Sequence, residues 1–577
     1  MAVIIFWKIK QRKSVQSCRP FFPKKRCRRC PVARNIAETF VKTAERFQER
    51  IGIIEAKSGR SVTFGELNRS SDGYAAYFCD KGVRPGDIVM LMVTPSVEFI
   101  ALTLALFKLG SPIVLIDPGM GYKNLLRCIA RVQPKVLVGI PKAILFARIF
   151  AKHFQTVQSF FCCGNSFGFF GPDISRSLDG AAPFPVYQPG EEDLAAIIFT
   201  TGSTGPPKGV RYEHSIFSAQ LRLIEEYYEI GPDDVDQPAF PLFALFSAAL
   251  GACSVIPDMN PTKPAQVDPQ KFVQSIDTYR VTYSFGSPAI WNVVSRYCLD
   301  HGITLKSVRK VLMAGAPVPY ELLTRVRAVL PPEASVYTPY GATESLPVAS
   351  IEGREVLAET WAMSRTGRGT CVGRALPGIE LRIIAISDEP IAELSESMFL
   401  KNGEMGEIIV RGEVVTRAYQ NNEEETRLAK IRDGASLWHR MGDVGYLDDK
   451  ERLWFCGRRA HRVVTEKGTL YSIPCEAIVN EHPGVYRSAL VGIPGTSEQA
   501  TRDKSANVPV LIIEPVKNND MREKTLLAEV RALAKASELT RDIQYFLIHR
   551  AFPVDIRHNA KIFREKLAIW AHKKIAR

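Results

Sequence analysis

Long uncharged apolar runs are absent from this sequence of 577 residues. A helix needs about 20 consecutive apolar residues to span a bilayer. The nearest candidate, residues 99–115, is interrupted by Lys108 and by Gly110, Ser111 and Pro112. This segment therefore predicts a buried helix that turns into a strand, and no transmembrane segment is expected. No repeat recurs at a fixed period, so a repeat architecture is not expected either.

Cysteines in a metal-binding arrangement are also nearly absent. Twelve cysteines are scattered singly or, once, as the neighbours Cys162 and Cys163. Only Cys27 and Cys30 have the spacing of half a zinc site, and no second Cys/His pair at suitable spacing lies nearby. A structural zinc site is therefore not predicted. Reduced thiols in a cytoplasm are the simpler interpretation.

Acidic residues are missing from the first 34 positions, which hold eleven Lys and Arg residues. The formal net charge is +14, so the other 543 residues carry only +3, and nucleic acid is not an expected partner. The short apolar run at 2–7 precedes the charges, the reverse of a secretory signal. We expect a solvated, disordered head in a cytoplasmic protein. Contact of residues 1–34 with an anionic membrane surface, favoured by cations beside Trp and Phe, and a misassigned translation start are the alternatives.

From residue 35 onward, apolar runs alternate with amphipathic stretches. Residues 87–93 predict a buried strand, residues 96–109 a helix and residues 112–116 the next strand. Further strands are predicted at 134–139, 195–200, 281–285, 310–313 and 335–338. Such alternation predicts an α/β fold in which crossover helices join parallel strands.

The residue composition of the chain changes after Gly457. Residues 458–468 are rich in Arg, Lys and His, and a compact unit of strands and helices follows. We therefore predict three parts: the basic head (1–34), a large N-terminal domain of sheets flanked by helices (35–457) and a small α+β C-terminal domain (458–577).

The strongest local signal is the segment 200–209, Thr-Thr-Gly-Ser-Thr-Gly-Pro-Pro-Lys-Gly, which follows an apolar strand. Its glycines let backbone N–H groups turn toward a ligand, and its hydroxyls and Lys208 add donors, so the loop suits a polyphosphate. It is not a P-loop, because Gly209 stands where Ser or Thr would follow the lysine. Taken alone, the segment is explained equally well as a flexible turn.

Four further motifs follow in order: Tyr340-Gly341-Ala342-Thr343-Glu344, Gly442-Asp443, Gly457-Arg458 and Asn559-Ala560-Lys561. Together with the segment 200–209, they resemble the superfamily of adenylate-forming enzymes, which includes acyl-CoA synthetases, luciferases and the adenylation domains of peptide synthetases. The resemblance covers residues 36–570. It implies a small, mobile C-terminal domain, an active site between the two domains, and ATP and Mg²⁺ as cofactors.

The resemblance also implies a role for each matching residue. The phosphate-binding loop comprises Thr200, Thr201, Gly202, Ser203, Thr204, Gly205 and Lys208. The adenine site comprises Gly315, Ala316, Pro317 and Tyr340, and Gly341 is a further nucleotide-binding residue. Thr343 contacts the α-phosphate, Glu344 holds Mg²⁺, Asp443 and Arg458 bind the ribose hydroxyls, and Lys561 bridges the substrate carboxylate and the α-phosphate. Mg²⁺ held by Glu344, together with Lys561 and the donors of the loop, would supply the positive charge that the approach of two anions requires.

Six segments resemble one subfamily more narrowly, the olefin β-lactone synthetases of bacterial long-chain hydrocarbon biosynthesis: 240–251, 257–262, 338–347, 439–443, 452–458 and 553–561. The implied reaction adenylates a 2-alkyl-3-hydroxyalkanoate, a 3-hydroxy fatty acid, whose own 3-hydroxyl then displaces AMP to close a β-lactone. The implied partners are a β-lactone decarboxylase and an NADPH-dependent ketone reductase. A long-chain fatty acyl-CoA ligase is the alternative, and a non-catalytic nucleotide-binding protein of the same fold is a further one.

Two positions depart from the wider superfamily. Ala460 stands where acyl-CoA synthetases usually have a hinge Asp or Lys, and Ala560 replaces the usual glycine before the C-terminal lysine. Loss of the domain rotation that admits CoA and neutral drift both explain these changes. The base for the 3-hydroxyl stays open among His214, His461 and His558. The apolar run at 240–246 is either the lining of a lipid tunnel or part of the core.

Overall fold

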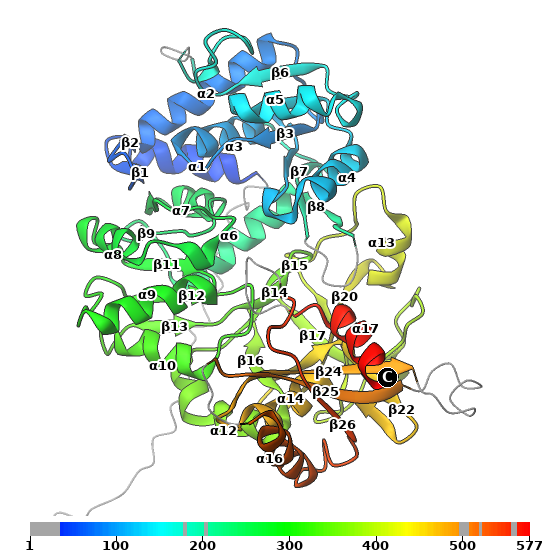
Figure 1. Ribbon diagram of the computed structural model, residues 1–577. Helices are drawn as coiled ribbons and strands as arrows, with labels where there is room; N and C mark the ends of the chain where they lie inside the picture. Colours follow the sequence, from blue (N-terminus) through cyan, green and yellow to red (C-terminus); the bar gives the residue numbers. More distant parts are fainter. Residues whose placement is uncertain are drawn as a thin grey trace, which may run out of the picture.

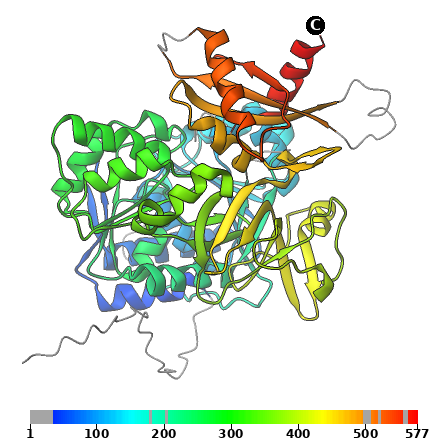
Figure 2. The same cartoon turned by 90° about the horizontal axis from the view of Figure 1, so that it is seen from below.

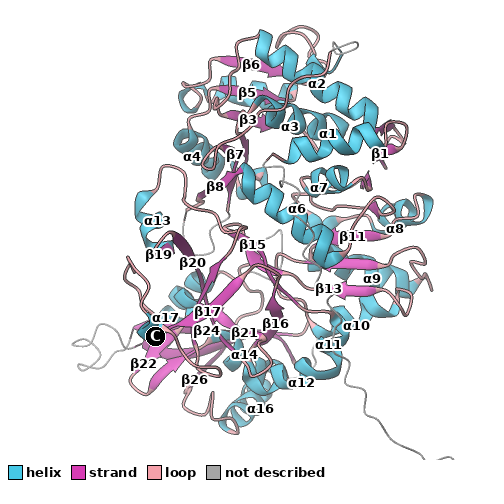
Figure 3. Ribbon diagram, turned by 180° about the vertical axis from the view of Figure 1, so that it is seen from behind, coloured by secondary structure: helices cyan, strands magenta, loops and turns pink. Residues whose placement is uncertain are grey.

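The computed structural model describes residues 35–176, 182–200, 206–494, 507–517, 522–554 and 562–576. Helices and strands alternate along most of this length (Figure 1). The predicted α/β class is confirmed, because two of the three large sheets are built mainly of parallel strands with helices packed beside them (Figure 3). Among the described residues, no helix combines the length and the apolar character that crossing a membrane requires.

The first sheet has six strands in the order β6-β5-β3-β4-β7-β8. Five are parallel and β8 pairs antiparallel with β7. The strands are β3 (Val89–Met92), β4 (Ile113–Leu115), β5 (Val136–Gly139), β6 (Ser159–Cys162), β7 (Leu194–Phe199) and β8 (Gly209–Glu213). The helices of this part are α1 (Ile36–Arg46), α2 (Phe64–Asp80), α3 (Val97–Leu109), α4 (Tyr122–Val132) and α5 (Pro141–Ile149).

The second sheet has seven strands in the order β13-β12-β11-β9-β10-β1-β2, of which only β2 is antiparallel to its neighbour. The strands are β1 (Ile51–Glu55), β2 (Ser61–Thr63), β9 (Val235–Asp236), β10 (Cys253–Ile256), β11 (Tyr283–Gly286), β12 (Lys310–Met313) and β13 (Ser335–Tyr337). Its helices are α6 (His214–Tyr228), α7 (Phe243–Leu250), α8 (Pro269–Thr278), α9 (Pro288–Asp300) and α10 (Tyr320–Ala328).

A third sheet, which the sequence pattern did not predict, is antiparallel and spans residues 340–458. Its strands are β14 (Tyr340–Ala342), β15 (Ser345–Ser350), β16 (Thr370–Ala375), β17 (Glu380–Ile384), β18 (Gly406–Arg411), β19 (Lys430–Asp433), β20 (Ser436–Leu447) and β21 (Leu453–Arg458). Three short helices accompany it: α11 (Gly353–Glu355), α12 (Trp361–Met363) and α13 (Glu423–Ala429).

The C-terminal unit follows the third sheet and lies at the lower end of the molecule in Figure 1. Figure 2 shows this unit, in orange and red, stacked on the rest of the chain. It contains the hairpin β22 (Val463–Thr465) and β23 (Gly468–Leu470) and the sheet of β24 (Val485–Pro494), β25 (Asn507–Pro515) and β26 (Tyr545–Ile548). Its helices are α14 (Ser472–Asn480), α16 (Glu523–Lys535) and α17 (Arg564–Ile575). The exact domain boundaries at 34/35 and 457/458 remain predictions.

Helix α3 illustrates why the most apolar stretch stays inside the protein. Ser96 caps it by accepting a hydrogen bond from the Phe99 amide, and Gly110 ends it in the left-handed conformation. A Cβ atom on Gly110 would also collide with the ring of Tyr187. Lys108 interrupts the apolar run without reaching solvent, because its Nζ donates to Asp72 Oδ1 at 2.5 Å and to Asn68 Oδ1 at 2.8 Å. A buried cation is tolerated here because both partners satisfy it.

Candidate active site

A cavity of about 1010 Å³ lies where the three large sheets and the C-terminal unit meet. Every predicted site residue that the structure describes lines it: Thr200, Lys208, Gly315, Ala316, Pro317, Tyr340, Gly341, Thr343, Glu344, Asp443 and Arg458. The predicted residues Thr201, Gly202, Ser203, Thr204, Gly205 and Lys561 lie outside the described residues. Ile562, the residue after Lys561, also lines the cavity. Segments more than 300 residues apart in the chain therefore meet at this cavity.

Strand ends explain why these residues meet. Thr200 follows β7, Gly315 follows β12 and Tyr340 follows β13, each just beyond the carboxyl end of a parallel strand. Ligands of open α/β sheets bind at those ends. The Thr200 amide donates to the Lys208 carbonyl at 2.9 Å, which closes the base of the Gly-rich loop between β7 and β8. Thr200 and Lys208, which stand on either side of residues 201–205 in this segment, are therefore held together at the cavity wall.

Tyr340, Asp443 and Arg458 form one hydrogen-bonded group. Tyr340 Oη donates to Asp443 Oδ2 at 2.6 Å, and Arg458 Nη1 lies 3.0 Å from Asp443 Oδ1. Asp443 and Arg458 are direct partners in the register of β20 and β21. Burial raises the pKa of Asp443, and the charge of Arg458 opposes that shift. The group offers a carboxylate and a guanidinium side by side, which suits recognition of two neighbouring hydroxyls.

Glu344 is held in place by residues that the sequence motifs did not single out. Tyr419 Oη donates to Glu344 Oε1 at 2.7 Å, and the amide of Thr416 donates to the Glu344 carbonyl at 2.9 Å. The carbonyl of Thr343 accepts a 2.5 Å hydrogen bond from Tyr212 Oη on β8. These contacts fix the turn between β14 and β15, so that the Thr343 and Glu344 side chains keep their positions beside the cavity.

Lys430 lies behind this turn and is fully enclosed. Its Nζ donates to the Thr416 carbonyl. Burial lowers the pKa of Lys430 to about 7, while the charges of Glu344 and Glu213 oppose the shift. Its register partner on β20 is His439, whose pKa burial lowers well below the usual range. Nothing in the local sequence around residue 430 marks the proximity of Lys430 to His439, which arises from the pairing of β19 with β20.

The loop lysine has a partner of its own. Lys208 Nζ forms an ion pair with Glu425 Oε2, on the first turn of α13, and lies 5.4 Å from the centroid of the Tyr419 ring. Lys208, Tyr419 and Glu425 all line the cavity. The cation that the motif supplies is therefore held between an aromatic face and a carboxylate, next to Glu344.

The residues present fit a magnesium ion that arrives with a nucleotide. Within the described parts of the chain, no group of three or more His, Cys, Asp and Glu side chains is arranged to hold a metal ion. Mg²⁺ commonly takes only one or two protein carboxylates and completes its shell with phosphate oxygens and water. Glu344, oriented by Tyr419, suits that role. When bound, the ion supplies charge neutralisation on the phosphates.

The other half of the cavity is apolar. Its walls come from α6, α7, α9, β11 and the loop before α7, and they include Phe217, Ile224, Phe240, Leu242, Phe243, Phe246, Phe285 and Ile290. Phe243 stacks on Phe285 with ring centroids 3.9 Å apart. Ala244 and Leu245, in contrast, are fully buried in the core. Of the run 240–246, the side chains of Phe240, Leu242, Phe243 and Phe246 therefore line the cavity, whereas Ala244 and Leu245 belong to the core. The lipid-tunnel interpretation of this lining stays a prediction.

One polar group borders this apolar half. Asp236, at the end of β9, accepts a hydrogen bond from Ser247 Oγ at 2.5 Å, and Ser247 Oγ lies 2.7 Å from Tyr283 Oη. Burial raises the pKa of Asp236 to about 8, although the hydrogen bond from Ser247 opposes the shift. Asp236 and Tyr283 both line the cavity. At neutral pH this carboxyl is therefore mainly protonated.

Two of the three histidines considered as the base for the 3-hydroxyl, His214 and His461, lie among the described residues. His214 is buried at the start of α6 against Phe107, does not line the cavity, and has a pKa that burial lowers to about 4. His461 lines the cavity and lies 3.3 Å from Glu565. His558 lies outside the described residues. His439, which the sequence motifs did not single out, lines the cavity as well.

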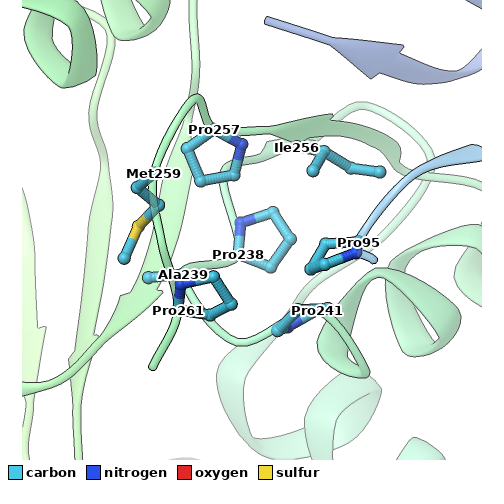
Figure 4. Close-up of a pocket in the computed structure, with 8 residues that line it drawn as sticks. All are labelled: Pro95, Pro238, Ala239, Pro241, Ile256, Pro257, Met259 and Pro261. Atoms are coloured by element: carbon cyan, nitrogen blue, oxygen red, sulfur yellow. The ribbon is translucent and has the colours of Figure 1, made fainter. Parts of the chain in front are cut away.

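A second, much smaller apolar niche of about 10 Å³ adjoins the apolar half of the cavity (Figure 4). It is lined by Pro95, Pro238, Ala239, Pro241, Ile256, Pro257, Met259 and Pro261. Ala239 and Pro261 also line the large cavity, so the niche lies on the other side of the same wall. Its volume is about that of one water molecule, so no substrate fits in it.

Comparison with known proteins places this arrangement in a family. The family described as AMP-binding enzyme matches residues 40–420. Olefin β-lactone synthetases from Stenotrophomonas maltophilia and Xanthomonas campestris are 44% and 45% identical to the chain, each over 89% of its length and over 92% and 91% of their own. The amide bond synthetase McbA from Marinactinospora thermotolerans superposes with a TM-score of 0.76 at 23% identity, covering 93% of this chain and 99% of its own. ATP-bound MatB from Rhodopseudomonas palustris superposes with a TM-score of 0.73 at 21% identity, covering 94% and 99%. The chain therefore belongs to the AMP-binding enzyme family.

Proposed function

We propose that this protein is an olefin β-lactone synthetase that uses ATP and Mg²⁺ to convert a 2-alkyl-3-hydroxyalkanoate into a β-lactone, AMP and pyrophosphate. The observation that carries the proposal is the identity of 44–45% over nine tenths of the chain to two enzymes of that name. The cavity supports it. Pockets for a single ligand measure roughly 300–1,000 Å³, so a volume of about 1010 Å³ suits a nucleotide together with an acyl chain.

In the first step, a substrate carboxylate oxygen attacks the α-phosphorus of ATP, and the bond from that phosphorus to the bridging oxygen of pyrophosphate breaks. Thr343, Lys208 and Lys561 are the residues that we assign to the phosphates and to the attacking carboxylate. Tyr340, Asp443 and Arg458 hold adenine and ribose. Positive charge and fixed positions provide most of the acceleration, because two anions must approach in line.

In the second step, the 3-hydroxyl oxygen attacks the acyl carbon and loses its proton, and the bond from that carbon to the AMP oxygen breaks. Nucleophile and electrophile belong to one molecule, so the step needs no CoA. The apolar walls around Phe243 and Phe285 exclude water that would hydrolyse the mixed anhydride. Ala460 lines the same cavity in place of a charged hinge residue, which agrees with an enzyme that does not have to admit CoA.

Incubation with a synthetic 2-alkyl-3-hydroxy acid, ATP and Mg²⁺, without CoA, tests the proposal. We expect β-lactone, AMP and pyrophosphate in equal amounts. Formation of an acyl-CoA from a plain fatty acid only when CoA is added, and never of a β-lactone, would establish an acyl-CoA ligase instead. ATP–pyrophosphate exchange that requires no carboxylic acid, or no exchange at all, would contradict both activities.

A further inference from the structure

One stretch of the first sheet is unusual in both charge and exposure. Residues 118–172 contain seven Lys and Arg and no Asp or Glu. They also carry six of the thirteen large apolar side chains that are exposed among the described residues, although they form only a tenth of the chain. The six are Tyr122, Leu145, Ile149, Phe160, Phe167 and Phe169. Exposed apolar groups at this density mark an interaction surface.

These side chains lie together around α5. Tyr122, at the start of α4, stacks on Phe150 at the end of α5, with ring centroids 6.3 Å apart. Arg148 lies over the ring of Phe170, at 4.8 Å from its centroid, which brings the loop after β6 back against the helix. Figure 1 shows α4, α5 and β6 grouped at the end of the molecule opposite α16. The surface is therefore remote from the C-terminal unit.

Three of these apolar side chains are especially exposed to solvent. Phe167 and Phe169, in the loop after β6, are 85% and 78% exposed, and Ile149 at the end of α5 is 67% exposed. Helix α5 turns Ala143, Ile144 and Ala147 toward the core and leaves Lys142, Leu145, Arg148 and Ile149 outside. A helix face that mixes cations with apolar groups is typical of a segment that lies at a membrane surface.

The cations of this surface are available to a partner. Lys135 is bound to Asp87. Lys123, Arg127, Arg131, Lys142, Arg148 and Lys152 have no ion-pair partner among the residues that the structure describes. No acid of the same segment competes for them. The surface is complementary to a negatively charged layer that also accepts aromatic side chains.

We infer that the face formed by α4, α5 and the loop 163–172 docks on an anionic lipid bilayer. Phe167, Phe169 and Ile149 enter the headgroup region, while Lys142, Arg148 and Lys152 bind lipid phosphates. None of the residues of this surface belongs to the segment 1–34 or lines the cavity, and docking requires neither ATP nor an acid. A negative vesicle-binding result would therefore contradict the docking inference without bearing on the proposed function.

Co-sedimentation of the full-length protein with vesicles tests the inference. Vesicles of phosphatidylglycerol mixed with phosphatidylcholine are compared with vesicles of phosphatidylcholine alone. The variant Phe167→Ser/Phe169→Ser should bind the anionic vesicles about tenfold more weakly, since it removes the inserted apolar area. Lys142→Gln/Lys152→Gln should lose about fivefold for each cation. Tyr486→Ser/Ile569→Ser, which removes exposed apolar groups of the C-terminal unit, is the matched control and should bind as the wild type does.

Three results would overturn the inference. The first is unchanged vesicle binding in both surface variants. The second is loss of binding in full-length Lys24→Gln/Lys25→Gln/Arg26→Gln with no effect of the loop variant, which would assign the contact to the head. The third is a change in the molar mass of the protein, measured by light scattering without vesicles, when Phe167 and Phe169 are replaced. That result would make this face an interface between copies of the chain. ATP–pyrophosphate exchange with a soluble acid should stay unchanged in every surface variant and confirms that each one is folded.

Discussion

Lys208 and Glu425, 217 residues apart in the sequence, form an ion pair at the wall of the cavity. The lysine belongs to the Gly-rich loop that we assign to the phosphates of ATP, and the glutamate belongs to the first turn of α13. A triphosphate must therefore compete with Glu425 for the same ammonium group. The pair is partly exposed, so its contribution is of the order of 1 kcal/mol or less.

The first prediction concerns this competition. Glu425→Gln should lower the KM for ATP by about two- to fivefold, because the loop lysine is released before the nucleotide arrives. The KM for the acid should not change. Steady-state ATP–pyrophosphate exchange measures both constants.

A double-mutant cycle shows whether the effect runs through the lysine. In a Lys208→Ala background, Glu425→Gln should have no further effect on the KM for ATP. Glu424→Gln, which removes an exposed acid from the same turn, is the control. If Glu424→Gln gives the same change, a general charge effect of the helix explains the result and the competition does not.

The second prediction concerns Tyr419, which orients Glu344 through a 2.7 Å hydrogen bond. Tyr419→Phe keeps the ring beside Lys208 and removes only the hydroxyl. Loss of a residue that orients a metal ligand typically costs 10- to 100-fold in metal affinity or activity. We expect the Mg²⁺ concentration for half-maximal exchange to rise by about tenfold or more. Tyr446→Phe, which removes a hydroxyl that bonds the Arg368 carbonyl, should leave the Mg²⁺ dependence unchanged; an equal shift in both variants would refute the assignment.

The third prediction follows from the raised pKa of Asp236, which burial brings to about 8. The folded protein holds this proton more tightly than the unfolded chain does. The stability due to the protonated carboxyl is therefore complete below about pH 3.8 and is lost as the pH rises through about 8. Thermal unfolding should show a fall in Tm between pH 6 and pH 9 that is smaller in Asp236→Asn, which does not ionise. Parallel curves for the variant and the wild type would mean that Asp236 does not carry this dependence.

The fourth prediction separates the two halves of the cavity. Phe243→Ala removes a ring that stacks on Phe285 and lines the apolar half of the cavity, which we assign to the acyl chain. The KM for a long-chain acid should rise by roughly tenfold or more, as expected for the loss of a buried aromatic contact, while the KM for ATP stays the same. Leu299→Ala, at an exposed site on α9, is the control for surface effects. A matching rise in the KM for ATP would show that the two halves are not independent.

The sequence predicted the parts of the site that lie at the ends of strands. Gly315, Tyr340 and Thr200 each follow an apolar run with a turn signal, and a single stretch of sequence contains both features. Helix α3 and its cap at Ser96 were likewise readable from local spacing. The antiparallel third sheet was not, since some of its pairings join strands that are far apart in the chain, such as β16 with β21 and β18 with β20.

The residues that the sequence missed act through partners far away in the chain. Tyr419 reaches Glu344 across 75 positions, and Glu425 reaches Lys208 across 217. In the sequence alone, Asp236 resembles any polar residue near a turn. The structure shows its true surroundings, because β9 pairs with β11 and Tyr283 then lies beside Asp236. No local pattern distinguishes these side chains from ordinary surface residues, because their roles depend on register and burial.

The proline-lined niche of Figure 4 has a consequence for how the acid is recognised. Pro238 and Pro241 bracket Ala239 and Phe240, so the wall between niche and cavity has few backbone conformations to lose. A wall that is already ordered imposes little entropic penalty when a flexible alkyl chain settles against it. The same stiffness limits adaptation to chains of other shapes. The rigidity of the four consecutive residues 238–241 would then decide which alkyl chains fit the wall as it stands.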